Sequence, residues 1–282
     1  MDFSRRIDGY CERTGPEFWS EPINAISNIA FIVAAILCLM LALRARRLDG
    51  PVIWLDLVLF CIGIGSFLFH TFATVWAALM DTGPIMLFIL SYFTVAMNRY
   101  AGLGWGRAVL LTIGFLGALV TAATMTRGAG PSILLPGPDT LYQTIGFWTA
   151  FMLAFGSLLI ARAGLLPSFG VAIGFPLAAW IAGEIIAAFT GPGISGWESY
   201  FPAMLALLSV GGWLVLRGHP AGTSLIVVAA IFSVSLSFRT IDSVICTHFS
   251  IGTHFLWHIL NAVVLGMLLM AVIRHGEAPQ RA

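Results

Sequence analysis

Long apolar runs, separated by short polar or Gly/Pro-rich segments, dominate the hydropathy pattern of the chain. A helix that crosses a bilayer needs about 20 consecutive apolar residues, and windows of that length predict nine transmembrane helices. We expect these helices over residues 24–43, 52–71, 75–97, 106–126, 140–161, 168–189, 199–216, 222–238 and 254–273. Pro176 and Glu184 interrupt the sixth run. The pattern therefore predicts an all-α polytopic membrane protein.

Arginines indicate the orientation of these helices, because cytoplasmic loops of membrane proteins are enriched in basic residues. Arginines follow the first, third, fifth, seventh and ninth predicted helices, whereas the loops of the other face hold chiefly Arg127 and Arg239. We therefore expect the N-terminus outside and the C-terminus in the cytoplasm. Cys11 and Cys246 then share the outer compartment, where a disulfide persists. They either form a bridge there or remain two free thiols.

The composition agrees with a membrane protein and gives no sign of a nucleic-acid partner. The 282 residues are 59% hydrophobic and 10% charged, and the formal net charge is +1, whereas a soluble domain carries about 25% charged residues. All fourteen basic residues are arginines, which is typical of a GC-rich genome, so we expect a bacterial inner membrane. We find no repeat and no separate soluble domain. Residues 1–275 are therefore expected to form one transmembrane domain, followed by a cytoplasmic tail over 276–282.

Ionisable side chains within membrane helices are costly and usually functional, and three predicted helix ends carry them. The second helix ends in GIGSFLFH, with Ser66 and His70 four residues apart. The third contains Asp81 near its start, and the last begins HFLWH, with His254 and His258. Residues four apart lie on one face of a helix. Because the topology brings all three helix ends to the outer face, we predict that these side chains converge.

Three imidazoles with an open fourth position are the ligand set of a catalytic zinc site. We therefore predict a metal centre formed by His70, His254 and His258. Bound zinc lowers the pKa of a water to about 7, so Asp81 is the candidate general base and Ser66 is a candidate donor to an oxyanion. The alternative is that the histidines are hydrogen-bonded packing residues, since a His-x-x-x-His pair alone is a weak pattern.

These residues resemble the alkaline ceramidase family, part of a superfamily of seven-helix membrane hydrolases that includes the adiponectin receptors. SFLFH matches the family's Ser-x-x-x-His motif, and Asp81 follows His70 at the family's eleven-residue spacing. HFLWHIL matches its final His-x-x-x-His motif, and IDSVIC resembles its Asp-x-x-x-Cys segment. YCERTGPEFWSEPINAISN resembles its N-terminal segment. The resemblance covers roughly residues 8–100 and 195–275.

The resemblance implies that His70, His254 and His258 bind zinc, while Ser66 and Asp81 assist its water. It also implies calcium binding by the N-terminal segment, residues 1–22. The calcium ligands that it implies are Asp8, the carbonyl of Tyr10, Glu12, Thr14 and Glu21. This second match is partial, because Gly9 and Thr14 stand where the family has an acidic residue and an asparagine.

The resemblance further implies a seven-helix ceramidase-like bundle, so the surplus of two predicted helices indicates an inserted hairpin within residues 127–195. The implied function is zinc-dependent hydrolysis of the N-acyl amide of ceramide, or of a related long-chain N-acyl lipid, to a sphingoid base and a fatty acid. The alternatives are a lipid-responsive receptor or scaffold with a structural zinc site, and a transporter. We expect a membrane lipid as the substrate and infer no obligate protein partner.

Overall fold

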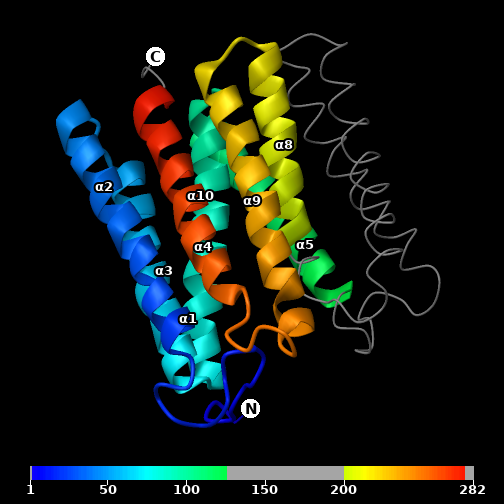
Figure 1. Ribbon diagram of the computed structural model, residues 1–282. Coiled ribbons are helices and arrows are strands. Elements are labelled where there is room, and N and C mark those ends of the chain that lie inside the picture. Colours follow the sequence, from blue (N-terminus) through cyan, green and yellow to red (C-terminus); the bar gives the residue numbers. More distant parts are fainter. Residues whose placement is uncertain (1, 126–199, 277–282) are drawn as a thin grey trace. The chain divides into compact units, whose positions relative to one another are not determined.

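A computed structural model describes residues 2–125 and 200–276 of the chain, and within these residues the regular elements are helices (Figure 1). They are α1 (Pro22–Ser27), α2 (Ile29–Ala45), α3 (Gly50–Phe72), α4 (Val75–Arg99), α5 (Trp105–Met125), α8 (Phe201–Leu216), α9 (Pro220–Ile245) and α10 (His254–His275). The first predicted helix corresponds to α1 and α2 together. The helices predicted at 140–161 and 168–189 lie outside the described residues, as does the hairpin predicted within 127–195.

Several of the described helices have the length and apolar character of membrane-spanning segments. Five segments in this part of the chain qualify: Pro22–Ala45, Gly50–Phe72, Val75–Arg99, Pro220–Ile245 and His254–His275. Trp105–Leu116 and Pro202–Leu216 are shorter apolar helices. Large apolar side chains such as Leu37 and Leu57 remain exposed on these segments, as expected for contact with lipid. The chain is therefore a helical integral membrane protein.

The described residues form two compact parts, residues 2–96 with 227–276 and residues 97–125 with 200–226. In the first part α10 packs against α1, α2 and α3, and α2 packs against α3 (Figure 1). A side chain at Gly63 of α3 would press on the backbone of Asn28, so this glycine permits the close approach that small residues provide between membrane helices. In the second part α5 packs against α8.

The N-terminal segment is fastened to the junction between α3 and α4. The Asp49 carboxylate caps the start of α3 by accepting the Val52 N–H at 3.1 Å. Ala73, with a left-handed φ of 46°, follows the last helical residue, Phe72. The Ile7 N–H donates to the Ala73 carbonyl at 2.8 Å, and the Val75 N–H donates to the Arg5 carbonyl at 3.0 Å. These bonds place the N-terminal segment at the end of α3 that carries His70.

The same N-terminal segment is linked covalently to the region between α9 and α10. Cys11 and Cys246, separated by 235 residues, form a disulfide. Of the two alternatives that the sequence left open, a bridge or two free thiols, the structure shows the bridge. Next to it, the Cys11 N–H donates to the Asp242 carboxylate at 3.2 Å. The N-terminal segment thus joins the end of α3 to the region that precedes α10.

Candidate metal centre

Three buried histidines from α3 and α10 lie against one another. His70 is in the last turn of α3, whereas His254 and His258 occupy the first two turns of α10. Their ring centroids are 4.6 to 5.2 Å apart, and one ligand nitrogen from each lies within 4.8 Å of the others. Each histidine is at most 2% exposed. The structure brings together the three side chains that the sequence predicted to converge.

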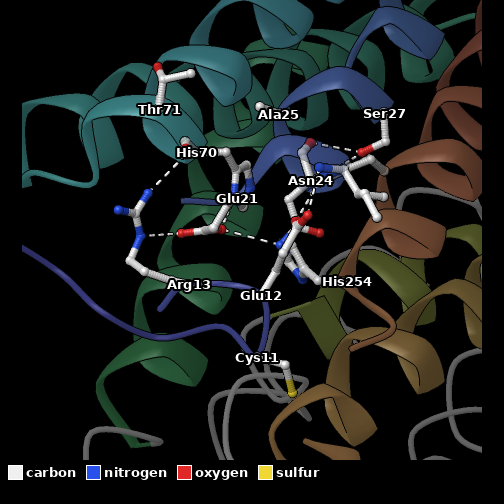
Figure 2. A network of polar contacts seen from close by, with 12 residues as sticks. Cys11, Glu12, Arg13, Glu21, Asn24, Ala25, Ser27, His70, Thr71 and His254 are labelled. Atoms are coloured by element: carbon white, nitrogen blue, oxygen red, sulfur yellow. Dashed lines mark hydrogen bonds and ion pairs between the residues drawn. The ribbon is translucent and has the colours of Figure 1, made fainter. Parts of the chain in front are cut away.

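A buried carboxylate orients the ring of His70 (Figure 2). Nδ1 of His70 lies 2.5 Å from Oε2 of Glu21, while Nε2 has no hydrogen-bond partner among the described residues. A carboxylate that accepts one ring N–H fixes the tautomer and leaves the lone pair of the other nitrogen for a metal. This arrangement suits Nε2 of His70 as a ligand atom.

A hydroxyl group orients the ring of His258. Nδ1 of His258 lies 2.7 Å from Oγ of Ser27, and this hydroxyl donates its own proton to the Asn24 carbonyl at 2.8 Å. Because the Ser27 proton is used in this way, the hydroxyl accepts the Nδ1–H of His258. Nε2 of His258 then carries the lone pair, in the same tautomer as His70.

The third histidine is held by ring stacking and by its backbone. The ring of Tyr10 stacks on His254 with the centroids 3.8 Å apart and 29° between the planes. The backbone N–H of His254 donates to Oδ1 of Asp242 at 2.9 Å, and the backbone N–H of Thr253 donates to the same oxygen at 2.6 Å. Nδ1 of the His254 ring has no hydrogen-bond partner in the described part of the chain. The ring is therefore fixed in place with a buried nitrogen still free to bind.

Two acidic residues that are distant in sequence cap the helices of this region. Asp242 caps α10 through the bonds described above, and Glu12 caps α1 by accepting the N–H groups of Ile23 and Asn24 at 2.7 and 2.8 Å. Burial raises the pKa of Glu12, and these two N–H bonds offset the rise only in part. Free N–H groups at a helix N-terminus favour such an acceptor. Both caps fix the start of a helix that carries site residues.

Arg13 is the cation nearest to the Glu21–His70 pair (Figure 2). Its Nε forms an ion pair with Glu21, and its other nitrogens donate to the carbonyls of Gly15 at 3.0 Å and His70 at 2.9 Å. Burial by itself would raise the pKa of Glu21, but the hydrogen bond with His70 and the charge of Arg13 outweigh burial and hold that pKa below its usual value. Glu21 is therefore a carboxylate.

Ser66 and Asp81 lie beside the histidines on neighbouring helices. Ser66 is 3% exposed in α3, one turn before His70. Asp81 of α4 lies within hydrogen-bond reach of the Ser66 side chain and interacts electrostatically with His70. A Cβ atom on Gly65 would collide with the backbone of Met80 and Asp81, so the absence of a side chain there allows α4 to approach. The predicted general base and oxyanion donor are thus next to each other.

The residues that the resemblance implies for calcium are either exposed or already bonded to donors of the chain. Asp8 and Thr14 are exposed, and the Tyr10 carbonyl accepts the Arg13 N–H at 3.2 Å. Both oxygens of Glu12 accept helix N–H groups, and both oxygens of Glu21 are bonded to Arg13, His70 or Asn24. Among the described residues, the three histidines form the single cluster with metal-binding spacing. These side chains do not fit a calcium ion as they stand.

The donors at the three-histidine cluster do fit zinc. Zinc binds neutral imidazole nitrogens, and catalytic sites use three protein ligands with the fourth position left to water or substrate. Two of the three rings hold the tautomer that presents Nε2, and all three are shielded from solvent. The fold and this cluster together define a helical membrane protein with a buried group of three histidines that could hold a metal ion.

A comparison with protein-family models found a match to the part of the chain that carries His70 and Asp81. Residues 9–135 match the model of the Ceramidase family. This segment is therefore similar to the ceramidase family, and the match confirms the resemblance read from the motifs that lie within it, SFLFH with Asp81 and the N-terminal segment. The match supports hydrolysis of ceramide as the activity. Searches of curated proteins and of solved structures found no match to the chain.

The residues that orient the histidines and cap α10 were not predicted from the sequence. Ser27 and Asp242 lie within the segments that carry the family resemblance, NAISN and IDSVIC, and their positions there were the available signal. The Asp242 carboxylate accepts the backbone N–H groups of Thr253 and His254. No sequence signal pointed to the contact between Arg13 and Glu21.

Proposed function

We propose that the chain is an intramembrane zinc-dependent amidohydrolase that cleaves the N-acyl amide of ceramide or a related long-chain N-acyl lipid. The observation that carries the proposal is the buried cluster of His70, His254 and His258, with Asp81 and Ser66 beside it. The match of residues 9–135 to the ceramidase family supports it. A metal centre among membrane helices suits a substrate that stays in the bilayer. The products are a fatty acid and a sphingoid base.

The side chains around the cluster suit addition of water to an amide. Zinc held by the three histidines supplies Lewis acidity and a water of lowered pKa. Asp81 accepts a proton from the attacking water as its oxygen bonds to the carbonyl carbon, and the Ser66 hydroxyl donates to the oxygen that becomes negative. Asp81 then returns the proton to the amide nitrogen, the C–N bond breaks, and the amine departs.

The position of Asp81 favours catalysis over a structural zinc site. A structural site is closed by a fourth protein ligand. Asp81 is not in the group of ligand atoms that lie within 4.8 Å of one another in the described chain, and its contact is with Ser66 instead. This arrangement supports an open fourth position, and so an enzyme rather than a receptor or scaffold.

The membrane orientation completes the proposal. The N-terminal segment, the disulfide and the metal centre face the outside of a bacterial inner membrane, and the C-terminal tail faces the cytoplasm. The disulfide between Cys11 and Cys246 supports an oxidising compartment for this face. We propose that residues 1–275 act as one hydrolase domain.

Replacing a ligand tests the proposal. We expect His258→Ala to lose both bound zinc and hydrolysis of ceramide, measured as zinc per chain and as release of fatty acid by the detergent-purified protein. His248→Ala is the matched control, because His248 is an exposed histidine outside the cluster, and it should retain both. Hydrolysis by zinc-free protein would contradict the mechanism. Wild-type protein that binds zinc without hydrolysing ceramide would favour the receptor or scaffold.

A further inference from the structure

The guanidinium of Arg13 is buried at the centre of the N-terminal segment. Arg13 is 8% exposed, and its nitrogens bond in three directions, to the Glu21 carboxylate and to the carbonyls of Gly15 and His70. The planar fork of arginine suits several fixed acceptors, whereas lysine offers a point charge. Arg13 therefore ties its own segment to Glu21 and to the last turn of α3.

Glu21 transmits this restraint to the metal cluster. One of its oxygens pairs with Arg13, and the other lies 2.5 Å from Nδ1 of His70 and 3.2 Å from Nδ2 of Asn24. Glu21 is 2% exposed, and a buried carboxylate that loses its counter-ion is strongly destabilised. Without the arginine charge, Glu21 would have to shift toward other donors, and the ring of His70 would lose its fixed orientation.

This arrangement also differs from a calcium site. The Tyr10 carbonyl, Glu12 and Glu21, three of the groups that the resemblance implies for calcium, already bond to donors within the protein, and Arg13 is one of those donors. The side chain that pairs with Glu21 is thus a permanent cation belonging to the chain. A calcium ion at Glu21 would have to displace it.

We propose that Arg13 is a positioning residue whose guanidinium holds the Glu21 carboxylate, and through Glu21 the ring of His70, in the geometry that binds zinc. Because this cation belongs to the chain, zinc retention does not require calcium. This inference deepens the proposed function and rests on the zinc centre described there. It predicts that Arg13 governs the affinity for zinc although it does not touch the metal. Loss of partners behind metal ligands typically weakens metal binding by about 10- to 100-fold.

The test measures the zinc affinity of the full-length protein in detergent by competition with a graded series of chelators. Arg13→Gln, which removes the charge, should bind zinc roughly 10- to 100-fold more weakly than wild type. Arg13→Lys keeps the charge without the fork and should fall between the two. Arg5→Gln is the matched control, because Arg5 is an exposed arginine of the same segment, and it should match wild type. Wild type should bind zinc equally with and without added millimolar calcium.

Separate readouts distinguish positioning from a purely structural role. The thermal unfolding midpoint is measured for the zinc-free and zinc-loaded forms, because positioning reduces the stabilisation gained from zinc whereas a structural role lowers both midpoints equally. If Arg13→Gln does not fold, the comparison of Arg13→Lys with wild type decides. Zinc affinity equal to wild type in the folded variant, or zinc retention by wild type that depends on calcium, would overturn the inference. Wild type without any zinc affinity would overturn the proposed function as well, whereas a zinc-binding protein without ceramide hydrolysis would overturn only that function.

Discussion

Each histidine of the candidate centre is held by a partner from another part of the chain. Glu21 holds His70 across 49 residues, and Ser27 holds His258 across 231 residues. Asp242 accepts the backbone N–H of His254. Partners of this kind orient a ligand before the metal arrives. Asp81 is in a different environment, because it contacts Ser66 and lies outside the cluster of ligand nitrogens. Asp81 can therefore be substituted without removing a metal ligand.

At the residue scale, Asp81→Asn separates proton transfer from metal binding. We expect the variant to keep zinc at the wild-type level, since all three histidines remain, and to hydrolyse ceramide roughly 10²–10⁴-fold more slowly because an amide cannot accept the proton. Zinc content and initial rates measured on the same preparation check this. Loss of zinc together with activity would instead identify Asp81 as a fourth ligand and favour a structural site.

At the scale of elements, the site depends on how closely α4 approaches α3. His70 and Ser66 are on α3, whereas Asp81 reaches them from α4. Gly65 permits the approach, because any Cβ there would collide with the α4 backbone at Met80 and Asp81. Close contacts through glycine are a common way for membrane helices to pack. The distance between the two helices therefore determines where the general base lies.

Gly65→Ala should displace Asp81 without removing any histidine. We expect zinc to be retained and the hydrolysis rate to fall about 10- to 100-fold, because small misplacements of a catalytic group have costs of this size. Gly83→Ala is the matched control, since Gly83 is also a helical glycine near Asp81 but a Cβ there meets nothing within 4 Å. Equal activity of the two variants would show that the spacing of α3 and α4 does not control the reaction.

For the whole molecule, long-range links hold together segments that lie far apart in the sequence. The Cys11–Cys246 disulfide joins the N-terminal segment to the region before α10. The Asp242 carboxylate adds a second connection, because it accepts the N–H groups of both Cys11 and His254. The backbone of the same segment also pairs with residues 73–75. Because these links meet near the histidines, the N-terminal segment contributes directly to the stability of the centre.

Breaking the disulfide should therefore loosen the site as well as the chain. Cys11→Ser should lower the free energy of unfolding by roughly 2–5 kcal/mol, the usual cost of losing a native disulfide, with a matching fall in the thermal midpoint in detergent. Cys61→Ser, at a free cysteine of α3, serves as the control and should stay near wild type. Reduction of the wild-type protein should reproduce the Cys11→Ser midpoint and change its mobility on electrophoresis. A midpoint unaffected by either treatment would count against this role.

Much of the fold was predictable because hydropathy is a local property of the chain. Runs of about 20 apolar residues mark membrane helices wherever they occur, and the seven predicted helices that fall within the described residues coincide with observed ones. The convergence of His70 with His254 and His258 followed from helix order and orientation. The calcium set was a transfer from the resemblance, and in the structure the Tyr10 carbonyl, Glu12 and Glu21 bond to donors of the chain. The number of spans across the whole chain stays a prediction.

The sequence by itself determined the helices, the cysteine pair available for a bridge, and which histidines meet. The tertiary structure alone decided what holds each of them: Glu21 and Arg13 behind His70, Ser27 behind His258, and Asp242 at the start of α10. The physical reason is the separation along the chain over which each interaction acts. Helix formation and membrane insertion depend on neighbouring residues, whereas a hydrogen bond or ion pair requires two groups to lie within a few ångströms after the whole chain has folded.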